Sequence, residues 1–492
     1  PRNDSVGQGD SAWVRGTPDS VLYTIRQLGI ARGGAGNMLY GSYRFTHVNL
    51  GANSQTGHYS QNEMYCTVGG GFYNVAPYDF ATIAGGDSNF AVDYCAIGGG
   101  HSNQALGLAA TVGGGRNNIA WGYNGVIGGG YQNVLGSDDA PTVSGGRANV
   151  AGGHYATVGG GYGNAAAAYC ATVGGGYADT ARALYSGVLS GYSNLAGAGV
   201  EDTAAVVCGG KDNSATAKFA FVGGGSLNVA RDFYATVGGG YGDTASGYGA
   251  TVAGGVRNAA SDHHATVCGG VSNRASNWYA TVGGGYSNSA SGSAATVAGG
   301  YINTASGGAA TVPGGYYNKA AGDCSFAAGS FARANHTNSF VWSDSVQSSS
   351  DSVYTTGANQ WRVRARGGVW FFSNRLMTSG VYLAPGSNSW SSACDSANKT
   401  DFQPVDHKAL LKKLATVPVR YYRMKDQNDG TKHIGPVAQE FYAAFGVGEN
   451  DKSINMADAD GVLFAAIQAL YEENQQLLHR IEVLEARLNQ GR

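Results

Sequence analysis

The sequence predicts a mostly β protein: a parallel β-solenoid with coils of about 15 residues, assembled as a homotrimeric fibre and followed by a small α+β domain. Three observations lead to this prediction. A glycine-rich motif recurs at a near-constant interval across more than half of the chain. The composition is rich in Gly and Tyr and poor in charge. The final residues carry apolar side chains at the alternating spacings of three and four that are typical of a coiled coil.

The repeat is the strongest signal. The string ATVGGG occurs intact five times, and near copies include ATVAGG, ATVCGG and ATVPGG. We mark each coil by the apolar residue before the glycines, which gives 17 coils spaced mostly by 15 residues across residues 66–330. The one long gap, from Leu189 to Val207, predicts a loop insertion. The markers are Val68, Ile83, Ile97, Val112, Ile127, Val143, Val158, Val173, Leu189, Val207, Val222, Val237, Val252, Val267, Val282, Val297 and Val312.

Other positions repeat with the markers. Asn follows six residues after most markers, as in Asn74, with Asp179 and Asp243 as variants; after Leu189 it comes one place early, at Asn194. Ala follows two residues later in nearly every coil, and residues at a fixed offset stack when each period makes one turn. We expect the Thr–Val step to place Thr outward and Val inward, and the glycines to form a corner at positive φ. The Asn suits a second corner, where its amide bonds the turn backbone and tolerates the left-handed conformation.

Composition excludes several classes of protein. The 492 residues include 81 Gly but only 9 Pro, which rules out the strict Gly-X-Y period of collagen. Charged residues make up 13% and Tyr numbers 30, unlike a disordered chain. The net charge is −2 and no basic cluster precedes the C-terminal region, so we expect no nucleic-acid partner. No apolar run approaches about 18 residues, so we expect no membrane span.

The Tyr that follows the glycines forms a partial column. Stacked packing that braces the corner is the favoured interpretation, and contact with a glycan or surface receptor is the alternative. Calcium-binding solenoid repeats need a regular Asp column, and here the polar column is mostly Asn, so we expect no metal and no cofactor. The column contains Tyr131, Tyr162, Tyr177, Tyr192, Tyr241, Tyr286, Tyr301 and Tyr316.

The cysteines are odd in number, and none lies in a C-x-x-C pair, so zinc sites and disulfide scaffolds are not predicted. Most occupy positions that neighbouring repeats give to Ala or Gly, so we expect small buried side chains. Disulfides between chains at equivalent positions are the alternative. The seven are Cys66, Cys95, Cys170, Cys208, Cys268, Cys324 and Cys394.

The chain outside the repeat divides into three segments. Residues 1–65, with a short apolar stretch from Val21 to Ile30, predict a cap or attachment segment. Residues 331–393 predict a non-repetitive β stem, in which WRVRARGGVWFFSN, from Trp361 to Asn374, has the aromatic and alternating pattern of strands. Residues 394–492 form the α+β domain, and its coiled coil spans 463–490.

Each coil buries little beyond one Val and one Ala while folding must order its whole backbone, so several chains are expected to share one axis. The terminal heptad pattern supports this, and we expect a parallel trimer in which the polar Asn474 sets the register. The pattern consists of Leu463, Ile467, Leu470, Asn474, Leu477, Ile481, Leu484 and Leu488.

Two resemblances follow from these motifs. The GGG-Y-x-N-x-A repeat of residues 66–330 resembles the left-handed β-roll heads of trimeric autotransporter adhesins. The C-terminal region resembles the intramolecular chaperone, auto-processing domain of phage endosialidase tail spikes and of many bacterial surface fibres. Three ordered motifs carry this second resemblance: CDSANKTDFQPVDHKALLKKL from Cys394, KHIGPVAQEFYAAFGVG from Lys432, and DADGVLFAAIQAL from Asp458.

The second resemblance implies a domain that drives trimerisation and then cuts itself off, before a Ser followed by Asp, with the help of a Lys five places after the Ser. The matching catalytic positions are Cys394, Asp395 and Lys399, so this chain departs from the family at the nucleophile. A thiol can replace a hydroxyl, and a nearby Lys could activate either one. The alternative is an inert Cys394, and we expect slow or absent cleavage because the family's geometry fits a smaller oxygen.

These inferences predict a structural and adhesive fibre that is extracellular, at a cell surface or on a virion, with a glycan or surface receptor as a further partner. The rival is a tail fibre or spike of a phage or injection system that binds or degrades glycans. Only Glu63 and Glu201 supply Glu before residue 341, whereas glycosidases use paired carboxylates, so no turnover enzyme is expected in the repeats.

Overall fold

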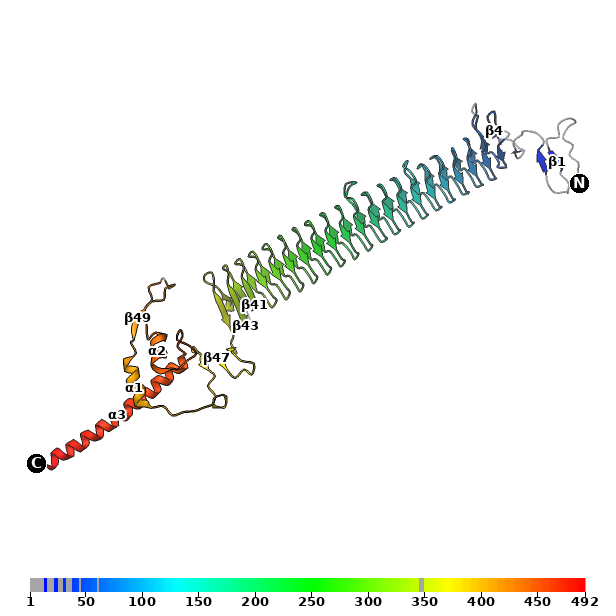
Figure 1. Cartoon of the computed structure of the whole chain (residues 1–492). Helices are drawn as coiled ribbons and strands as arrows, with labels where there is room; N and C mark the ends of the chain where they lie inside the picture. Colours follow the sequence, from blue (N-terminus) through cyan, green and yellow to red (C-terminus); the bar gives the residue numbers. More distant parts are fainter. Residues whose placement is uncertain are drawn as a thin grey trace. The chain divides into compact units, whose positions relative to one another are not determined.

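The computed structural model describes residues 13–15, 22–24, 30–31, 38–43, 46–59, 62–344, 349–427 and 429–491. The chain divides into two compact units, Pro1–Arg364 and Ala365–Arg492, and each is described by itself. The first unit is a parallel β-solenoid whose coils stack along one axis (Figure 1). The predicted parallel β-solenoid is therefore confirmed. Most of the predicted N-terminal cap, including most of Val21 to Ile30, lies outside the described residues.

Each coil contributes two short parallel strands. In one coil these are β7 (Thr67–Val68) and β8 (Val75–Ala76), and they pair with β9 (Thr82–Ile83) and β10 (Phe90–Ala91) of the next coil. Repetition of these pairings builds two parallel sheets, one of 22 and one of 21 strands. Single bridges link a third position of successive coils. Backbone hydrogen bonds therefore run along the axis at three points of each coil between Ala52 and Ser330.

The solenoid extends beyond the glycine-rich repeat at both ends. Its first sheet begins at β3 (Ile30–Ala31) and ends at β45 (Trp361–Arg364). Past the last marker, Ala327 and Val341 take the inward position and are fully buried, although the glycine triplet is absent there and only Gly329 remains at a corner. The backbone pairing therefore continues without the glycine motif, through the first part of the segment that was predicted as a stem.

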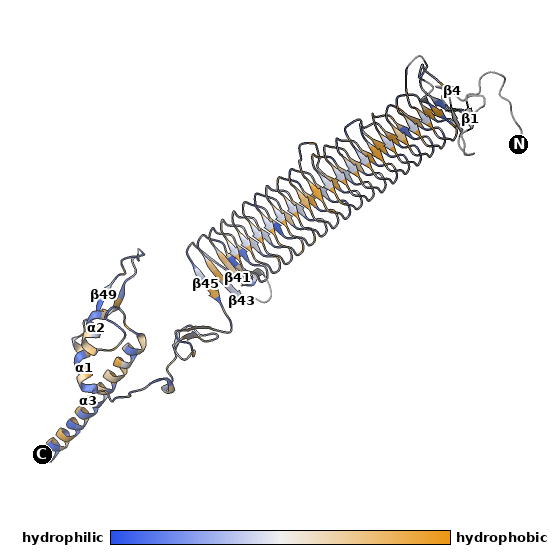
Figure 2. Ribbon diagram, turned by 45° about the vertical axis from the view of Figure 1, so that its right-hand side comes forward, coloured by the Kyte–Doolittle hydropathy of each residue, from blue (hydrophilic) through white to orange (hydrophobic). Residues whose placement is uncertain are grey.

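The core is a narrow stack of small side chains. The markers are buried within the strands while the preceding Thr points outward, as the Thr–Val step predicts, and the strands form the orange stripe of Figure 2. One marker was misassigned: Val188 is only 1% exposed, whereas Leu189 is 62% exposed. Val188 places Asn194 at the regular offset of six residues. The insertion that follows is closed by Asp202, whose Oδ2 accepts the N–H groups of Ala198 and Gly199 at 2.9 Å.

The repeated Asn side chains form a buried column of hydrogen bonds. Asn118 is representative: its Nδ2 donates to the carbonyls of Gly114 and Gly130, each at 3.0 Å. Its Oδ1 accepts the backbone N–H of Asn133 in the next coil at 2.9 Å. The amide therefore bonds the turn backbone as expected, but the left-handed residue is the preceding Asn117, with φ of 54°. Each Asn satisfies polar groups that a dry core would otherwise leave unpaired.

The third glycine of each triplet has the strictest requirement. Gly300 has φ of +90°, and a Cβ on it would lie 2.3 Å from the carbonyl oxygen of Gly315 in the next coil. Gly299, immediately before it, has open space at the same position. The close approach of two coil backbones therefore explains why this third position is always Gly while its neighbours vary.

Asp179 and Asp243 interrupt the Asn column. Both are fully buried, and Oδ1 of each accepts the backbone N–H of the next Asn, at 2.8 Å from Asn194 and 2.7 Å from Asn258. The second oxygen, Oδ2, has no hydrogen-bond partner in either residue. It occupies the position from which an Asn would donate to two glycine carbonyls. Burial raises the pKa of both carboxyl groups. A protonated Asp restores one of the missing donors.

We expect Asp179→Asn with Asp243→Asn to stabilise the fibre at pH 7 and to have little effect near pH 4. Because the folded-state pKa is raised, the native state binds the proton more tightly than the unfolded chain, so stability falls as pH rises above the ordinary Asp value of about 3.9. Restoring the donors should contribute about 1–3 kcal/mol per site at pH 7. Thermal unfolding midpoints of the wild type and the double variant at both pH values measure this stabilisation. Asp87→Asn is the control, because the side chain of Asp87 is half-exposed. Equal midpoints for wild type and double variant at pH 7 would contradict the prediction.

The second unit contains a small sheet and three helices. The sheet consists of β46 (Val369–Phe372), β47 (Gly380–Leu383) and β48 (Ser391–Ser392), all antiparallel. A hairpin of β49 (Arg420–Tyr422) and β50 (His433–Gly435) lies between the first two helices in the sequence. The helices are α1 (His407–Thr416), α2 (Ala438–Phe445) and α3 (Met456–Gln490).

Candidate functional site

The peptide bond between Ala393 and Cys394 lies at the end of a strand. In β48, Ser392 and Ser391 pair with Val381 and Tyr382 of β47. The backbone N–H of Ala393 donates to the carbonyl of Gly380 at 3.0 Å and continues this pairing. The sheet therefore fixes the chain up to the residue before the predicted nucleophile.

A short turn reverses the chain directly after that bond. Asp395 caps the 3-10 turn η3 (Ser396–Asn398), and its side chain accepts the N–H of Ala397 at 2.9 Å. The N–H of Lys399 donates to the carbonyl of Ser396 at 3.1 Å and closes the turn. Asp residues favour this role because the carboxylate satisfies N–H groups that the first helical turn leaves free. The turn brings residues five apart in the sequence to the same place.

The turn joins two of the three predicted site residues. Nζ of Lys399 donates to Sγ of Cys394 at 2.8 Å, and both residues are exposed. A thiolate is the reactive form of Cys. The third predicted residue, Asp395, bonds to neither Cys394 nor Lys399 within the described turn; its carboxylate accepts a hydrogen bond from the turn backbone. Asp395 therefore acts as a positioning residue. This arrangement can activate a sulfur nucleophile next to the carbonyl of Ala393.

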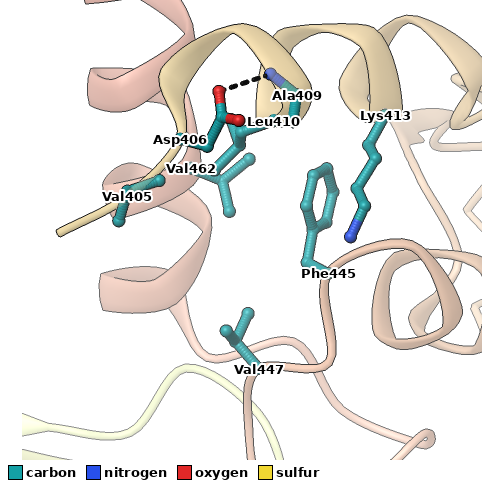
Figure 3. A pocket seen from close by; sticks show the side chains of 8 residues that line it. All are labelled: Val405, Asp406, Ala409, Leu410, Lys413, Phe445, Val447 and Val462. Carbon is teal, nitrogen blue, oxygen red and sulfur yellow. Dashed lines mark hydrogen bonds between the residues drawn. The ribbon is translucent and has the colours of Figure 1, made fainter. Parts of the chain in front are cut away.

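The helices after the site form a compact core of their own. Asp406 caps α1 by accepting the N–H of Ala409 at 3.0 Å (Figure 3). Leu410, Phe445 and Val462 line the hollow in this view, where α1 meets the end of α2 and the first part of α3. The ion pair of Arg420 with Glu440, at 2.9 Å, ties the hairpin to α2.

The predicted heptad positions lie on α3 and face outward in the single chain. The helix turns small residues toward the domain, where Val462, Ala465, Ala466 and Ala469 are buried. The heptad side chains remain 48–72% exposed. This exposure and spacing are those that the predicted coiled coil requires. They are Leu463, Ile467, Leu470, Leu477, Ile481, Leu484 and Leu488.

Aromatic columns follow the solenoid on two of its corners. In the predicted Tyr column, Tyr177 and Tyr192 stack with ring centroids 4.8 Å apart, and Arg147 lies 5.3 Å from the rings of Tyr131 and Tyr162. These rings brace successive coils while remaining close to half exposed. The sequence reasoning missed a second column three residues before the markers, which includes Tyr65, Phe80 and Tyr94 with φ near +60°. A search at that offset would have found it.

The cysteines divide into three groups by burial. Cys66 and Cys95 are buried as expected, and burial raises the pKa of Cys66 to about 12. Cys170 and Cys208 are half-buried, and all seven thiols are free in the single chain. Cys268, Cys324 and Cys394 are exposed, so the expectation of small buried side chains is wrong for these three. They lie on corners or outside the solenoid, where no core surrounds the sulfur.

A family model described as "Chaperone of endosialidase" matches residues 394–447. The match begins at Cys394, the residue after the candidate bond, and it covers the Cys394–Lys399 turn, α1 and α2. The comparison with curated proteins found no match to the chain. The chain therefore carries a C-terminal chaperone domain of the endosialidase type behind a β-solenoid. Within the described residues, no helix has the length and apolar character needed to cross a membrane.

Proposed function

We propose that the protein is a homotrimeric fibre whose C-terminal domain, residues 394–492, acts as an intramolecular chaperone for trimerisation. The observation that carries the proposal is the match of the chaperone family to residues 394–447, which follow a long solenoid and a small sheet in the sequence. Successive coils are nearly identical, so chains that meet along the solenoid could pair in many registers of similar energy. The single heptad face of α3 has one register and supplies the alignment that the coils lack.

Light scattering of the purified full chain tests this proposal. We expect a mass of three chains, and electron microscopy should show a thin rod on the order of 100 Å from the stacked coils at about 4.8 Å per coil. A control with Ile481→Asp in the heptad face of α3 should lose the trimer, because a charge at a core position removes apolar burial from every helix. A wild-type chain that remains monomeric at micromolar concentration would refute the proposal.

We further propose that the turn after Ala393 supports self-cleavage. Lys399 takes the thiol proton, and Sγ of Cys394 attacks the carbonyl carbon of Ala393. The C–S bond forms, the C–N bond breaks, and the proton passes to the freed amine of Cys394. Water then hydrolyses the thioester, which leaves a carboxylate on Ala393 and restores the thiol. The distance of 2.8 Å between Nζ and Sγ supports the first step.

The solenoid and the chaperone domain also bear on where the fibre acts. The family description names endosialidases, and a rod that precedes such a chaperone in the sequence suits a virion tail fibre or a surface adhesin. The half-exposed Tyr column offers flat rings to a glycan or a surface receptor. We propose binding rather than turnover for the repeats, because their Asp residues are scattered and Glu is almost absent from them.

A further inference from the structure

The bond between Ala393 and Cys394 is held on both sides and is open to solvent. The N–H of Ala393 donates to the carbonyl of Gly380 at 3.0 Å, and the cap by Asp395 fixes the turn that follows Cys394. The match to the chaperone family begins at the same bond. Ala393, Cys394 and Lys399 are all exposed in the single chain. The residues on both sides of the bond are therefore accessible to a small molecule in solution.

A sulfur at residue 394 decides what the first step of cleavage produces. When Sγ attacks the carbonyl carbon of Ala393, a C–S bond forms, the C–N bond breaks, and the amide becomes a thioester. The thiol proton passes through Nζ of Lys399, 2.8 Å from Sγ, to the freed α-amine of Cys394. A hydroxyl at this place would give an oxygen ester. A thiol is a stronger acid than a hydroxyl, so its anion leaves a carbonyl more readily, and a thioester passes its acyl group to another thiol far more easily.

The amine that leaves the carbonyl stays beside it. The carbonyl of Ala393 and the α-amine remain joined through the side chain of Cys394, so the thioester can return to the amide through a small ring of Sγ, Cβ, Cα, N and the carbonyl carbon. A tethered amine acts at an effective concentration that no dissolved nucleophile reaches, so this return dominates in water. Release of the chaperone domain therefore needs a nucleophile that attacks thioesters faster than water does. Thiolates are such nucleophiles.

We propose that the turn of Cys394 and Lys399 is an acyl-transfer site, at which a small thiol from solution takes the carbonyl of Ala393 in preference to water. The incoming thiolate attacks the thioester carbon, its own C–S bond forms, and the bond to Sγ breaks. Sγ leaves as a thiolate and takes up the proton that the incoming thiol gave up, so nothing is oxidised or reduced. The products are a fibre with a thioester at Ala393 and a chaperone domain that begins with Cys394. This inference rests on the proposed self-cleavage and names the co-substrate of its second step.

Intact mass spectrometry of the purified full chain, with and without mercaptoethanesulfonate, tests the transfer. A phosphine reductant in every sample keeps the native thiols free, so that a mixed disulfide cannot be mistaken for a thioester. We expect the thiol to raise the rate of cleavage about tenfold or more. The fragment of residues 1–393 should carry one thiol in place of the hydroxyl of its carboxyl group, and the fragment of residues 394–492 should be unmodified. Cleavage that the thiol does not accelerate, with a free carboxylate at Ala393, overturns the transfer and leaves hydrolysis.

Two variants of the nucleophile are the matched controls. The Cys394→Ser chain forms an oxygen ester, so the thiol should leave its rate of cleavage unchanged; equal acceleration of this variant and the wild type would overturn the transfer. The Cys394→Ala chain should stay intact with the thiol, which excludes direct attack on the amide. A Cys394→Ser chain that cleaves beside a wild-type chain that stays intact even with the thiol overturns the acyl transfer alone. Intact chains in all samples, Cys394→Ser included, overturn the proposed self-cleavage itself.

Discussion

A gene shortened to residues 1–393 is expected to yield little soluble trimer, with a loss on the order of tenfold or more relative to the full chain. Most of the product should be aggregated or mispaired. The repeat has a core of small side chains and long rows of outward Thr, so it offers no strong preference for one alignment of the chains. Transiently exposed strand ends then pair in wrong registers. Size-exclusion chromatography with light scattering measures the yield and the mass of each species.

The matched control is the full chain with Cys394→Ala, which keeps the chaperone and cannot use the thiol. It should assemble like the wild type, because the substitution lies on an exposed turn and removes no core contact. A second control ends the chain at residue 470 and removes most of the heptad face while keeping α1 and α2. An intermediate yield would assign part of the effect to the coiled coil. Wild-type trimers from residues 1–393 would show that the domain is dispensable for assembly.

The regular part of the solenoid was predictable because its sequence period equals its structural period. Two adjacent apolar residues caused the one misassigned marker: Val188 and Leu189 both suit the core, and only the offset to Asn194 distinguishes them. The extent of the solenoid was harder to predict. Backbone pairing needs no glycine triplet. The coils after Val312 keep their inward residues, Ala327 and Val341, at intervals of 15 and 14 residues, but of the corner glycines they keep only Gly329.

The contact between Lys399 and Cys394 could be expected in part from the sequence, and the catalytic roles of the two residues stay predictions. Spacing alone places Lys399 five residues after Cys394, and the turn that brings them together depends on local hydrogen bonds. The role of Asp395 as a cap follows from general preferences at the first turn of a helix. The arrangement of the small sheet was not predicted. The run Val369–Phe372 indicates a strand, but only its pairing with β47 shows which side chains share a face.

Self-cleavage should be slow in the wild-type chain and faster after Cys394→Ser. The products are a fibre that ends at Ala393 and a fragment of residues 394–492. Because the nucleophile Cys394 and the side-chain amine of Lys399 belong to one turn of one chain, the rate of cleavage should not depend on protein concentration. Cys394→Ala and Lys399→Ala should each leave the chain intact, since one removes the nucleophile and the other its proton acceptor. Intact mass spectrometry over a time course gives the rates.

Variants of Asp395 separate positioning from chemistry in the same experiment. The carboxylate caps the turn through the N–H of Ala397 at 2.9 Å, and Asn caps equally well, so Asp395→Asn should preserve most of the rate seen with Cys394→Ser. Asp395→Ala loses about 1 kcal/mol of cap stabilisation and should slow cleavage roughly fivefold, because the turn then holds Lys399 against the sulfur or oxygen less often. If Asp395→Asn cleaves as slowly as Asp395→Ala, the negative charge of the carboxylate itself takes part in cleavage. A Cys394→Ser chain that stays intact at full length would refute the assignment of the scissile bond.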